Sequence, residues 1–111
     1  MKRGEIFIAK LDPTLGSEIK KARPVVIISN DANNEMSKTV TIIPLSSQNT
    51  EKIRFFEVLI PDDIGLTKKS KARADQIRTI DKSRLTKKIG RLGVETILKL
   101  NRAVKIHLDL G

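Results

Sequence analysis

The sequence predicts a small α+β domain that is mainly β, a strongly bent antiparallel sheet or partial barrel followed by a C-terminal helix. Short β-branched runs separated by turn residues fill residues 4–80, and the apolar pattern changes to a 3.6-residue period from residue 94 onward. A chain of 111 residues buries roughly 65% of its unfolded surface, which is enough for one core. We therefore expect residues 1–111 to form a single domain.

Five strands are expected, at residues 4–11, 24–29, 39–45, 54–60 and 71–80. The second is a nearly continuous β-branched run, which suits a strand covered on both faces. Pro44 cannot donate a backbone hydrogen bond, so the third strand should stop pairing there or lie at an edge. The alternation of the fifth strand breaks phase near Gln76, which predicts a bulge.

Polar and turn-forming residues predict the connections between these strands. Residues 14–22 have little to bury and should form a mobile surface loop able to carry binding groups. Residues 30–34 predict a turn-rich connection, and residues 46–50 a polar loop at the end of the third strand. Asp81 is suited to cap a short turn through Leu85.

One helix is expected after the glycine-rich residues 90–93. Its apolar residues should lie mostly on one face and pack on the sheet; they are Val94, Ile97, Leu98, Leu100, Val104 and Leu108. His107 also lies in this helix, far along the chain from the other polar candidates, and is expected to be an ordinary surface or packing residue.

The charge of the chain favours a polyanionic partner. It has 22 basic and 13 acidic residues, a formal net charge of +9 and a pI of about 10.1. Nucleic acid is the first expectation, and an anionic membrane surface or a strongly acidic protein the second. Residues 68–91 carry ten of the basic residues and only two acids, a pattern typical of phosphate contacts and also of an ordinary solvated face.

Several classes of protein and site are excluded or disfavoured by what the sequence lacks. There is no apolar run long enough to span a membrane, and the first residues lack a signal-peptide pattern, so a cytoplasmic protein is expected. With no Cys and one His, a structural zinc site is excluded. A carboxylate-bound Mg²⁺ site stays open, but the acids are scattered, so we expect chemistry without a metal or cofactor. Three Phe and no Tyr or Trp argue against broad base-stacking surfaces.

Several motifs resemble those of a known family. They occur in the same order as in that family and span nearly the whole chain. They are Gly4-Glu5, Leu11-Asp12-Pro13-Thr14 with Gly16-Ser17-Glu18, Arg23-Pro24-Val25, Asn30-Asp31, and Gln76-Ile77-Arg78-Thr79-Ile80-Asp81 with Arg84-Leu85. The family is the MazF/PemK mRNA interferases, which are toxins of type II toxin-antitoxin modules.

This resemblance implies a homodimer of small CcdB-like, SH3-like antiparallel β-barrels, each with a C-terminal helix. It implies cleavage of single-stranded RNA at short sequences without metal, by attack of the ribose 2′-OH, to give a 2′,3′-cyclic phosphate and a 5′-OH. It also implies an antitoxin. The charge of this chain predicts that the antitoxin has an acidic, partly disordered segment covering residues 14–21 and the basic site.

The resemblance also implies the catalytic residues. Arg23 matches the family's catalytic arginine, and a guanidinium can hold two phosphate oxygens with a charge that needs no pKa tuning. Ser46 falls where the family has a catalytic Thr or Ser. In the PemK branch an Arg and an Asp serve as acid and base, and Arg73 and Asp75 match them. An equally plausible role for this pair is a phosphate and base reader with an orienting carboxylate.

The expected RNA-binding residues are Ser17, Ser47, Lys68, Lys69, Lys71, Gln76 and Arg78. The three lysines should act through charge alone. Gln76 offers both a donor and an acceptor to a base edge, but could equally tie strands together, and Arg78 also suits a structural role at its strand end. Ser17 stands where the PemK branch has His, so a histidine-assisted role is unsupported in this chain.

Two rival functions remain open at the level of sequence. A CcdB-like gyrase poison on the same fold would act by protein binding through the terminal helix rather than through Arg23. A non-catalytic nucleic-acid-binding barrel would survive the loss of Ser46 unharmed.

Overall fold

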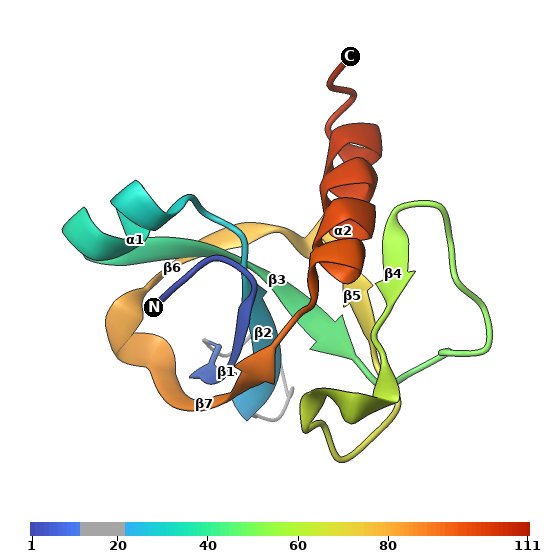
Figure 1. Cartoon of the computed structure of the whole chain (residues 1–111), viewed down its shortest axis with the longest axis horizontal. Coiled ribbons are helices and arrows are strands. Elements are labelled where there is room, and N and C mark those ends of the chain that lie inside the picture. Colours follow the sequence, from blue (N-terminus) through green and yellow to red (C-terminus); the bar gives the residue numbers. More distant parts are fainter. Residues whose placement is uncertain (12–21) are drawn as a thin grey trace, which may run out of the picture.

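Seven strands and two α-helices make up the part of the chain that the computed structural model describes, residues 1–11 and 22–111 (Figure 1). The strands are β1 (Glu5–Lys10), β2 (Ala22–Ile27), β3 (Thr39–Ser46), β4 (Glu57–Leu59), β5 (Lys71–Arg73), β6 (Arg78–Asp81) and β7 (Leu85–Arg91). The helices are α1 (Asp31–Met36) and α2 (Val94–His107), and three short 3₁₀ turns are η1 (Asp62–Ile64), η2 (Ala74–Gln76) and η3 (Lys82–Arg84). The predicted loop at residues 14–22 lies almost wholly outside the described residues.

The sheet is antiparallel throughout and strongly bent. Its hydrogen-bonded order is β4-β5-β3-β2-β1-β7, and β6 pairs with β3 beside this path. The predicted mainly β fold with a C-terminal helix is therefore confirmed. Over the described residues the sheet does not close on itself, so the term barrel applies only loosely.

Strand β2 is packed against apolar side chains on both of its faces. Val25, Val26 and Ile27 are all fully buried. Val26 belongs to the apolar cluster under α2, whereas Val25 and Ile27 belong to a second cluster on the other face. Because side chains alternate along a strand, three consecutive buried residues require apolar contacts on both faces, as the β-branched run predicts.

Strand β3 is the central element, and Pro44 lies within it. On one edge β3 pairs with β2, where Val25 faces Pro44. On the other edge Thr39–Ile42 pair with β6, and Leu45 and Ser46 pair with β5. The prediction that the strand stops at Pro44 was wrong, since it continues to Ser46. Pro44 instead lies where the edge of β3 that faces away from β2 changes its partner from β6 to β5.

Two predicted strands are shorter or divided. The run at 54–60 forms only β4, because Glu57 N donates to Arg54 O at 2.9 Å and closes a turn that includes Phe55 and Phe56. The run at 71–80 divides into β5, η2 and β6, so a 3₁₀ turn replaces the predicted bulge near Gln76. Helix α1 occupies part of the predicted connection at 30–34, capped by the Asn30 side chain, which accepts from Asn33 N.

The sequence analysis did not predict β7, which pairs with β1 along the edge of the sheet. Its register against β1 is irregular, with Phe7 opposite Lys88, Ile8 opposite Lys87 and Ala9 opposite Leu85. Such irregularities kink a strand and re-aim its side chains. Asp81 accepts from Ser83 N at 2.8 Å and begins η3, which confirms the predicted capped turn before β7.

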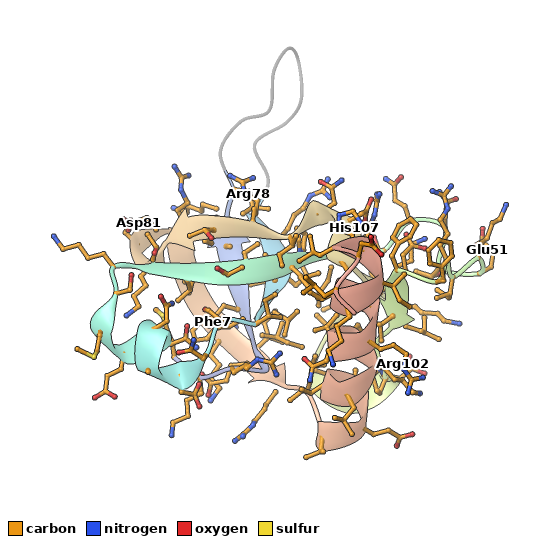
Figure 2. All side chains as sticks on the ribbon, turned by 90° about the horizontal axis from the view of Figure 1, so that it is seen from above. Phe7, Glu51, Arg78, Asp81, Arg102 and His107 are labelled. Atoms are coloured by element: carbon orange, nitrogen blue, oxygen red, sulfur yellow. The ribbon has the colours of Figure 1, made fainter. Side chains whose placement is uncertain are left out.

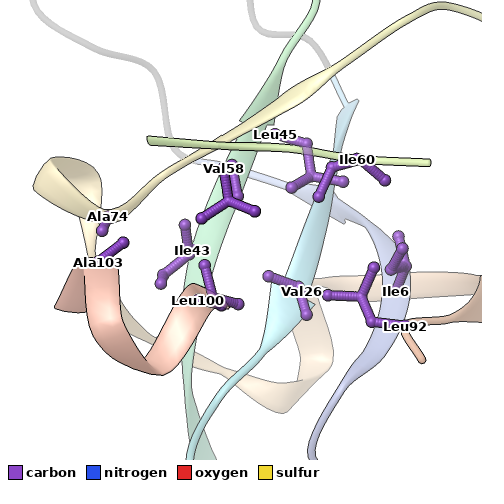
Figure 3. Packing of buried hydrophobic residues seen from close by; sticks show 11 residues of the cluster. Ile6, Val26, Ile43, Leu45, Val58, Ile60, Ala74, Leu92, Leu100 and Ala103 are labelled. Atoms are coloured by element: carbon purple, nitrogen blue, oxygen red, sulfur yellow. The ribbon is translucent and has the colours of Figure 1, made fainter. Parts of the chain in front are cut away.

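Helix α2 packs mainly against β4 and η2, over the apolar cluster on one face of the sheet (Figure 3). Leu100 and Ala103 are buried against Ile43 and Ala74. The prediction that Val94, Leu98 and Leu108 share this face was wrong, because they are 75%, 61% and 46% exposed. Leu98 lies two residues before Leu100, about 200° away around a helix, so the two cannot face the same surface. No helix among residues 1–11 and 22–111 is long and apolar enough to cross a membrane.

Close packing of η1 against β7 fixes the segment that follows η1. Gly90 has no room for a side chain, because an added Cβ would lie 2.3 Å from the Ile64 carbonyl oxygen. Gly65 has a φ of +95°, in the left-handed region that glycine favours. The first residue of segment 65–70 is therefore held in a fixed place beside β7.

Candidate active site

A groove of about 660 Å³ lies between the first residues of β2, the end of β3, β7 and residues 65–70. Its polar lining comes mainly from Arg23, Ser46, Ser47, Gln48, Thr67, Lys68, Ser70, Lys87 and Lys88. Ile8, Pro24, Leu45, Leu66 and Ile89 supply apolar surface. The groove is thus polar, basic and open enough to take an extended polyanion.

Arg23 and Ser46 meet in this groove because of the β2–β3 register. Val25 pairs with Pro44, and in an antiparallel pair the next positions outward bring residue 23 and residue 46 to the same end of the two strands. The Arg23 side chain is exposed, and Ser46 is half-buried. The Ser46 Oγ accepts a hydrogen bond from Gln48 N at 3.2 Å. A hydroxyl that accepts one bond still has a hydrogen to donate.

The groove combines several cations with no acid among its described lining residues. Lys68, Lys87 and Lys88 accompany Arg23, and no Asp, Glu or His is present in that lining. Lys88 forms an ion pair with the nearly buried Glu5. Burial would raise the pKa of Glu5, but bonds from Lys88 and Lys2 N and the charge of Lys88 outweigh it and lower this pKa.

Lys87 and Lys88 were not among the predicted site residues. Both belong to the basic run noted in the sequence, but without a prediction of β7 nothing placed them beside Arg23. The signal that could have found them is the spacing of apolar Leu85, Ile89 and Leu92 around charged residues, which is weak because it fits neither a strand nor a helix well.

A second cavity, of about 430 Å³, lies across residues 47–54 from the groove. It is lined by Asn49, Glu51, Lys52, Arg54, Glu57, Lys71 and Arg73. Arg73 belongs to this cavity and not to the lining of the groove that holds Arg23 and Ser46. Of the predicted catalytic residues, Arg23 and Ser46 thus line the groove, Arg73 lines the second cavity, and Asp75 lines neither.

Arg73 and Asp75 form a two-point ion pair. Arg73 Nε donates to Asp75 Oδ1 at 3.2 Å, and its Nη2 donates to Oδ2 at 2.7 Å. This bond is the largest influence on Arg73 and raises its pKa above the ordinary value. Burial would raise the pKa of Asp75, but the hydrogen bond and charge of Arg73 outweigh it and lower this pKa.

These shifts oppose the assignment of Asp75 as base and Arg73 as acid. A base at neutral pH needs a raised carboxylate pKa, and an acid needs a lowered guanidinium pKa. Both shifts run the other way. The geometry favours the alternative expectation, an anion-binding Arg73 oriented by the Asp75 carboxylate.

Among the predicted RNA-binding residues that the structure describes, Lys71 is the one whose side chain turns inward. Its side chain is 7% exposed, and its Nζ is 3.0 Å from Glu57 Oε1. An ammonium that is paired in this way is less available to a phosphate than an exposed one, so the geometry does not favour RNA binding by Lys71 through charge, and that role stays a prediction. Its position in the β3–β5 pairing, opposite Ser46, gives it a different role.

The remaining predicted RNA-binding residues fall in several places. Ser47 and Lys68 line the groove, and Lys69 lines a small neighbouring hollow with Lys68. Gln76, at the end of η2, and Arg78, on β6, are exposed but line neither the groove nor the second cavity; Figure 2 shows Arg78 pointing outward from the sheet. Ser17 lies outside the described residues.

His107 is the last residue of α2 (Figure 2) and lines neither the groove nor the second cavity. Its ring centre lies 6.2 Å from that of Phe56, so it makes an ordinary packing contact. In the described part of the chain, no group of three or more His, Asp or Glu residues is arranged to hold a metal ion.

The sequence matches a known family over almost its full length. The family model described as the PemK-like, MazF-like toxin of type II toxin-antitoxin systems matches residues 2–108. The chain is 40% identical to Endoribonuclease MazF9 of Mycobacterium tuberculosis over 116 aligned positions, covering 99% of this chain and 98% of that protein. It is 37% identical to Endoribonuclease EndoA of Bacillus subtilis, covering 99% and 96%.

Solved structures agree with the sequence matches. An endoribonuclease in complex with its cognate antitoxin from a mycobacterial species superimposes with a TM-score of 0.83 at 25% identity, covering 100% of this chain and 97% of that one. The Mycobacterium tuberculosis toxin MazF-mt6 gives a TM-score of 0.82 at 28% identity, covering 96% and 98%. Fold, length and motifs therefore agree, and the chain belongs to the PemK-like, MazF-like toxin family of type II toxin-antitoxin systems.

Proposed function

We propose that this chain is an endoribonuclease toxin that cleaves single-stranded mRNA at selected sequences without a metal ion. The observation that carries the proposal is the basic groove in which Arg23 and Ser46 lie together. The names of its relatives, Endoribonuclease MazF9 and Endoribonuclease EndoA, support the same activity.

The proposed reaction needs a proton acceptor for the 2′-OH, stabilisation of the charge on the phosphate and a proton donor for the leaving oxygen, all of which protein groups can supply. The ribose 2′-oxygen attacks the adjacent phosphorus and loses its proton, the bond from phosphorus to the 5′-oxygen breaks, and that oxygen gains a proton. The products are a 2′,3′-cyclic phosphate and a 5′-OH. The fixed charge of Arg23 stabilises the phosphate as negative charge builds on its oxygens, and the Ser46 hydroxyl donates to one of those oxygens.

Arg73 and Asp75 are assigned to binding rather than proton transfer. Arg73 presents a guanidinium that Asp75 holds in a fixed orientation on the wall of the second cavity. A guanidinium held in this way binds a phosphate or a base edge with little loss of side-chain freedom. In this role the pair holds RNA that extends beyond the cleaved bond.

The proposed partners follow from charge and family. We infer a cytoplasmic homodimer whose activity is held in check by an acidic antitoxin segment seated over the basic groove. The net charge of +9 supports an acidic partner, and a mycobacterial relative has been solved with its cognate antitoxin. A short groove on one 111-residue subunit supports a channel that two subunits share.

The decisive test is cleavage of a long single-stranded RNA by the purified protein in EDTA, with sequencing of the ends. Cuts at recurrent short sequences, with 2′,3′-cyclic phosphate ends, are expected. RNA that stays intact across many substrates would overturn the nuclease assignment. Toxicity that persists in Arg23→Ala would then favour a CcdB-like protein-binding toxin, and RNA binding without cleavage a non-catalytic barrel.

Sedimentation at the assay concentration tests the shared channel. Activity is expected to follow the dimer fraction as the protein is diluted. A monomer that cuts at the full rate would contradict the homodimer.

A further inference from the structure

A buried ion pair forms part of the wall of the second cavity. Lys71, on β5, and Glu57, on β4, have side chains only 7% and 2% exposed, and Lys71 Nζ lies 3.0 Å from Glu57 Oε1. Burying two charges costs free energy unless every remaining donor and acceptor is matched. The other bonds that these two groups make therefore indicate what the pair holds.

The Lys71 ammonium fastens the segment that follows Ser46. Its Nζ also donates to the carbonyl oxygens of Asn49 and Lys52, both at 3.1 Å. Those two residues form a turn in which Lys52 N donates to Asn49 O at 3.2 Å, and Asn49 has a positive φ of 52°. A non-glycine residue in that conformation needs support from its surroundings, and Lys71 provides it.

The same segment forms one wall of the groove. Ser46, Ser47 and Gln48 line the groove, while Asn49 and Lys52 line the second cavity. Ser46 is also the partner of Lys71 in the β3–β5 register. Lys71 is thus opposite Ser46 in the sheet, and its ammonium holds the turn that follows Ser46, Ser47 and Gln48.

Glu57 extends the connection toward Arg73. Its Oε1 accepts from Arg54 N at 2.9 Å, and its Oε2 lies 3.6 Å from Arg73 Nε. Glu57 is opposite Arg73 in the β4–β5 register. The Arg73 guanidinium is therefore held by two carboxylates, those of Glu57 and Asp75.

We propose that Lys71 and Glu57 are positioning residues that fix the two halves of the RNA site relative to each other. Lys71 sets the wall formed by Ser46–Gln48, Glu57 sets the Arg73 guanidinium, and their ion pair joins the two. This inference rests on the proposed nuclease function, and it adds a specificity role: RNA on both sides of the cleaved bond meets groups held at a fixed separation. A merely structural pair would affect stability alone.

The test uses Lys71→Met, which keeps the length of the stem and removes the ammonium, and Glu57→Gln, which keeps the shape and removes the charge. Lys105→Met, an exposed lysine on α2, is the matched control. The variants are compared on a preferred RNA and on RNAs changed by one base, at a temperature where circular dichroism shows each to be folded. The ratio of kcat/KM between preferred and changed RNA is the readout.

Lys71→Met is expected to lower this selectivity ratio by about tenfold and to lower kcat on the preferred RNA, because the wall formed by Ser46–Gln48 is held less rigidly. Glu57→Gln is expected to lower selectivity through weaker RNA binding, and its effect should be non-additive with that of Arg73→Ala. Lys105→Met should match the parent. Selectivity and kcat at parental values in folded Glu57→Gln, or in folded Lys71→Met, would overturn the proposal.

Hydrogen exchange separates failure of this inference from failure of the nuclease function. If the parent cuts no RNA, faster exchange of the Gln48 and Lys52 amides in Lys71→Met than in Lys105→Met still supports the positioning of the wall. Equal exchange in the two variants overturns it. The same measurement also decides the case in which Lys71→Met melts below the assay temperature.

Discussion

The Arg73 guanidinium and the Asp75 carboxylate lie edge to edge, with two hydrogen bonds of 3.2 and 2.7 Å between them. A pair held in this way orients a cation, and it makes proton exchange between the two groups unfavourable because each stabilises the charged form of the other. In the proposed reaction we therefore assign the proton of the 2′-OH to another group, which agrees with the absence of Arg73 from the lining of the Arg23 groove.

This pair predicts a loss of stability in acid. The folded pKa of Asp75 lies below its ordinary value of 3.8, so its contribution is complete above that value and is lost as the pH falls through the folded pKa. Glu57, whose pKa is also lowered because bonds from Arg54 N and Lys71 outweigh its burial, acts in the same direction. Urea unfolding should show the parent losing stability over this acid range and Asp75→Asn losing less. Equal acid slopes for the two proteins would contradict this expectation.

Arg23→Ala should slow cleavage by about a hundredfold or more, the scale found when one transition-state donor is removed. The side chain is exposed at the start of β2, so the fold should be unaffected. Single-turnover cleavage at saturating RNA measures the effect, with Arg102→Ala, on the exposed face of α2 (Figure 2), as the control. A near-parental rate for Arg23→Ala would show that the active site lies elsewhere.

Ser46→Ala should reduce the rate at saturating RNA and leave the affinity nearly unchanged. The lost hydroxyl donates to the phosphate in the reaction, while its present bond from Gln48 N lies at the surface and is replaced by water. Binding to an uncleavable RNA with a 2′-deoxy residue at the cut site separates the two quantities. A variant that loses only affinity would make Ser46 an RNA-binding residue and not a catalytic one.

Lys68→Gln with Lys87→Gln should weaken RNA binding and flatten its dependence on salt. Both side chains are exposed on the groove, and each lost single-strand phosphate contact lowers the slope of log affinity against log salt by about 0.7, or about 1.4 for two. The cut site should not move. Lys38→Gln with Lys105→Gln, which removes the same charge from elsewhere, should change the slope far less.

Gly90→Ala should destabilise the fold by about 1–3 kcal/mol, because the new Cβ would meet the Ile64 carbonyl oxygen, a backbone atom that cannot turn aside. Gly93→Ala is the matched control, since nothing lies within 4 Å of its added Cβ. Urea unfolding midpoints at one pH compare the two. Equal midpoints would mean that η1 moves freely away from β7.

The sequence predicts the parts of this fold that depend on local patterns. The β-branched run at residues 24–29 forms β2 because burial on both faces needs only apolar side chains in succession. Strand β7 was not predicted, since Lys87 and Lys88 carry no apolar alternation and the strand is held through its backbone pairing with β1. The helical period separates Leu98 from Leu100, but which of the two faces the core is decided by the sheet that the helix meets, and no local signal indicates it.

The candidate site also has a part that local sequence patterns predict and a part that they do not. The meeting of Arg23 with Ser46 follows from two strands that the sequence predicts, whatever role each residue has. The inward turn of Lys71 depends on Glu57, fourteen positions earlier, and on the carbonyl groups of Asn49 and Lys52, which come before Glu57 in the chain. A lysine in a basic run has the same sequence signature whether it faces RNA or a buried carboxylate.

Because the apolar interior lies on both faces of one sheet, the order of synthesis matters to this chain. The buried residues of the cluster that holds Val25, Ile27, Val40, Ile42 and Ile80 all lie on strands that leave the ribosome before β7, and from β7 only the partly buried Leu85 packs against them. The cluster on the other face waits for Leu92, Leu100 and Ala103, and the groove waits for Lys87. A nascent chain with half of its core assembled thus still lacks one wall of the groove, and the basic site is completed only as the last strand and helix emerge.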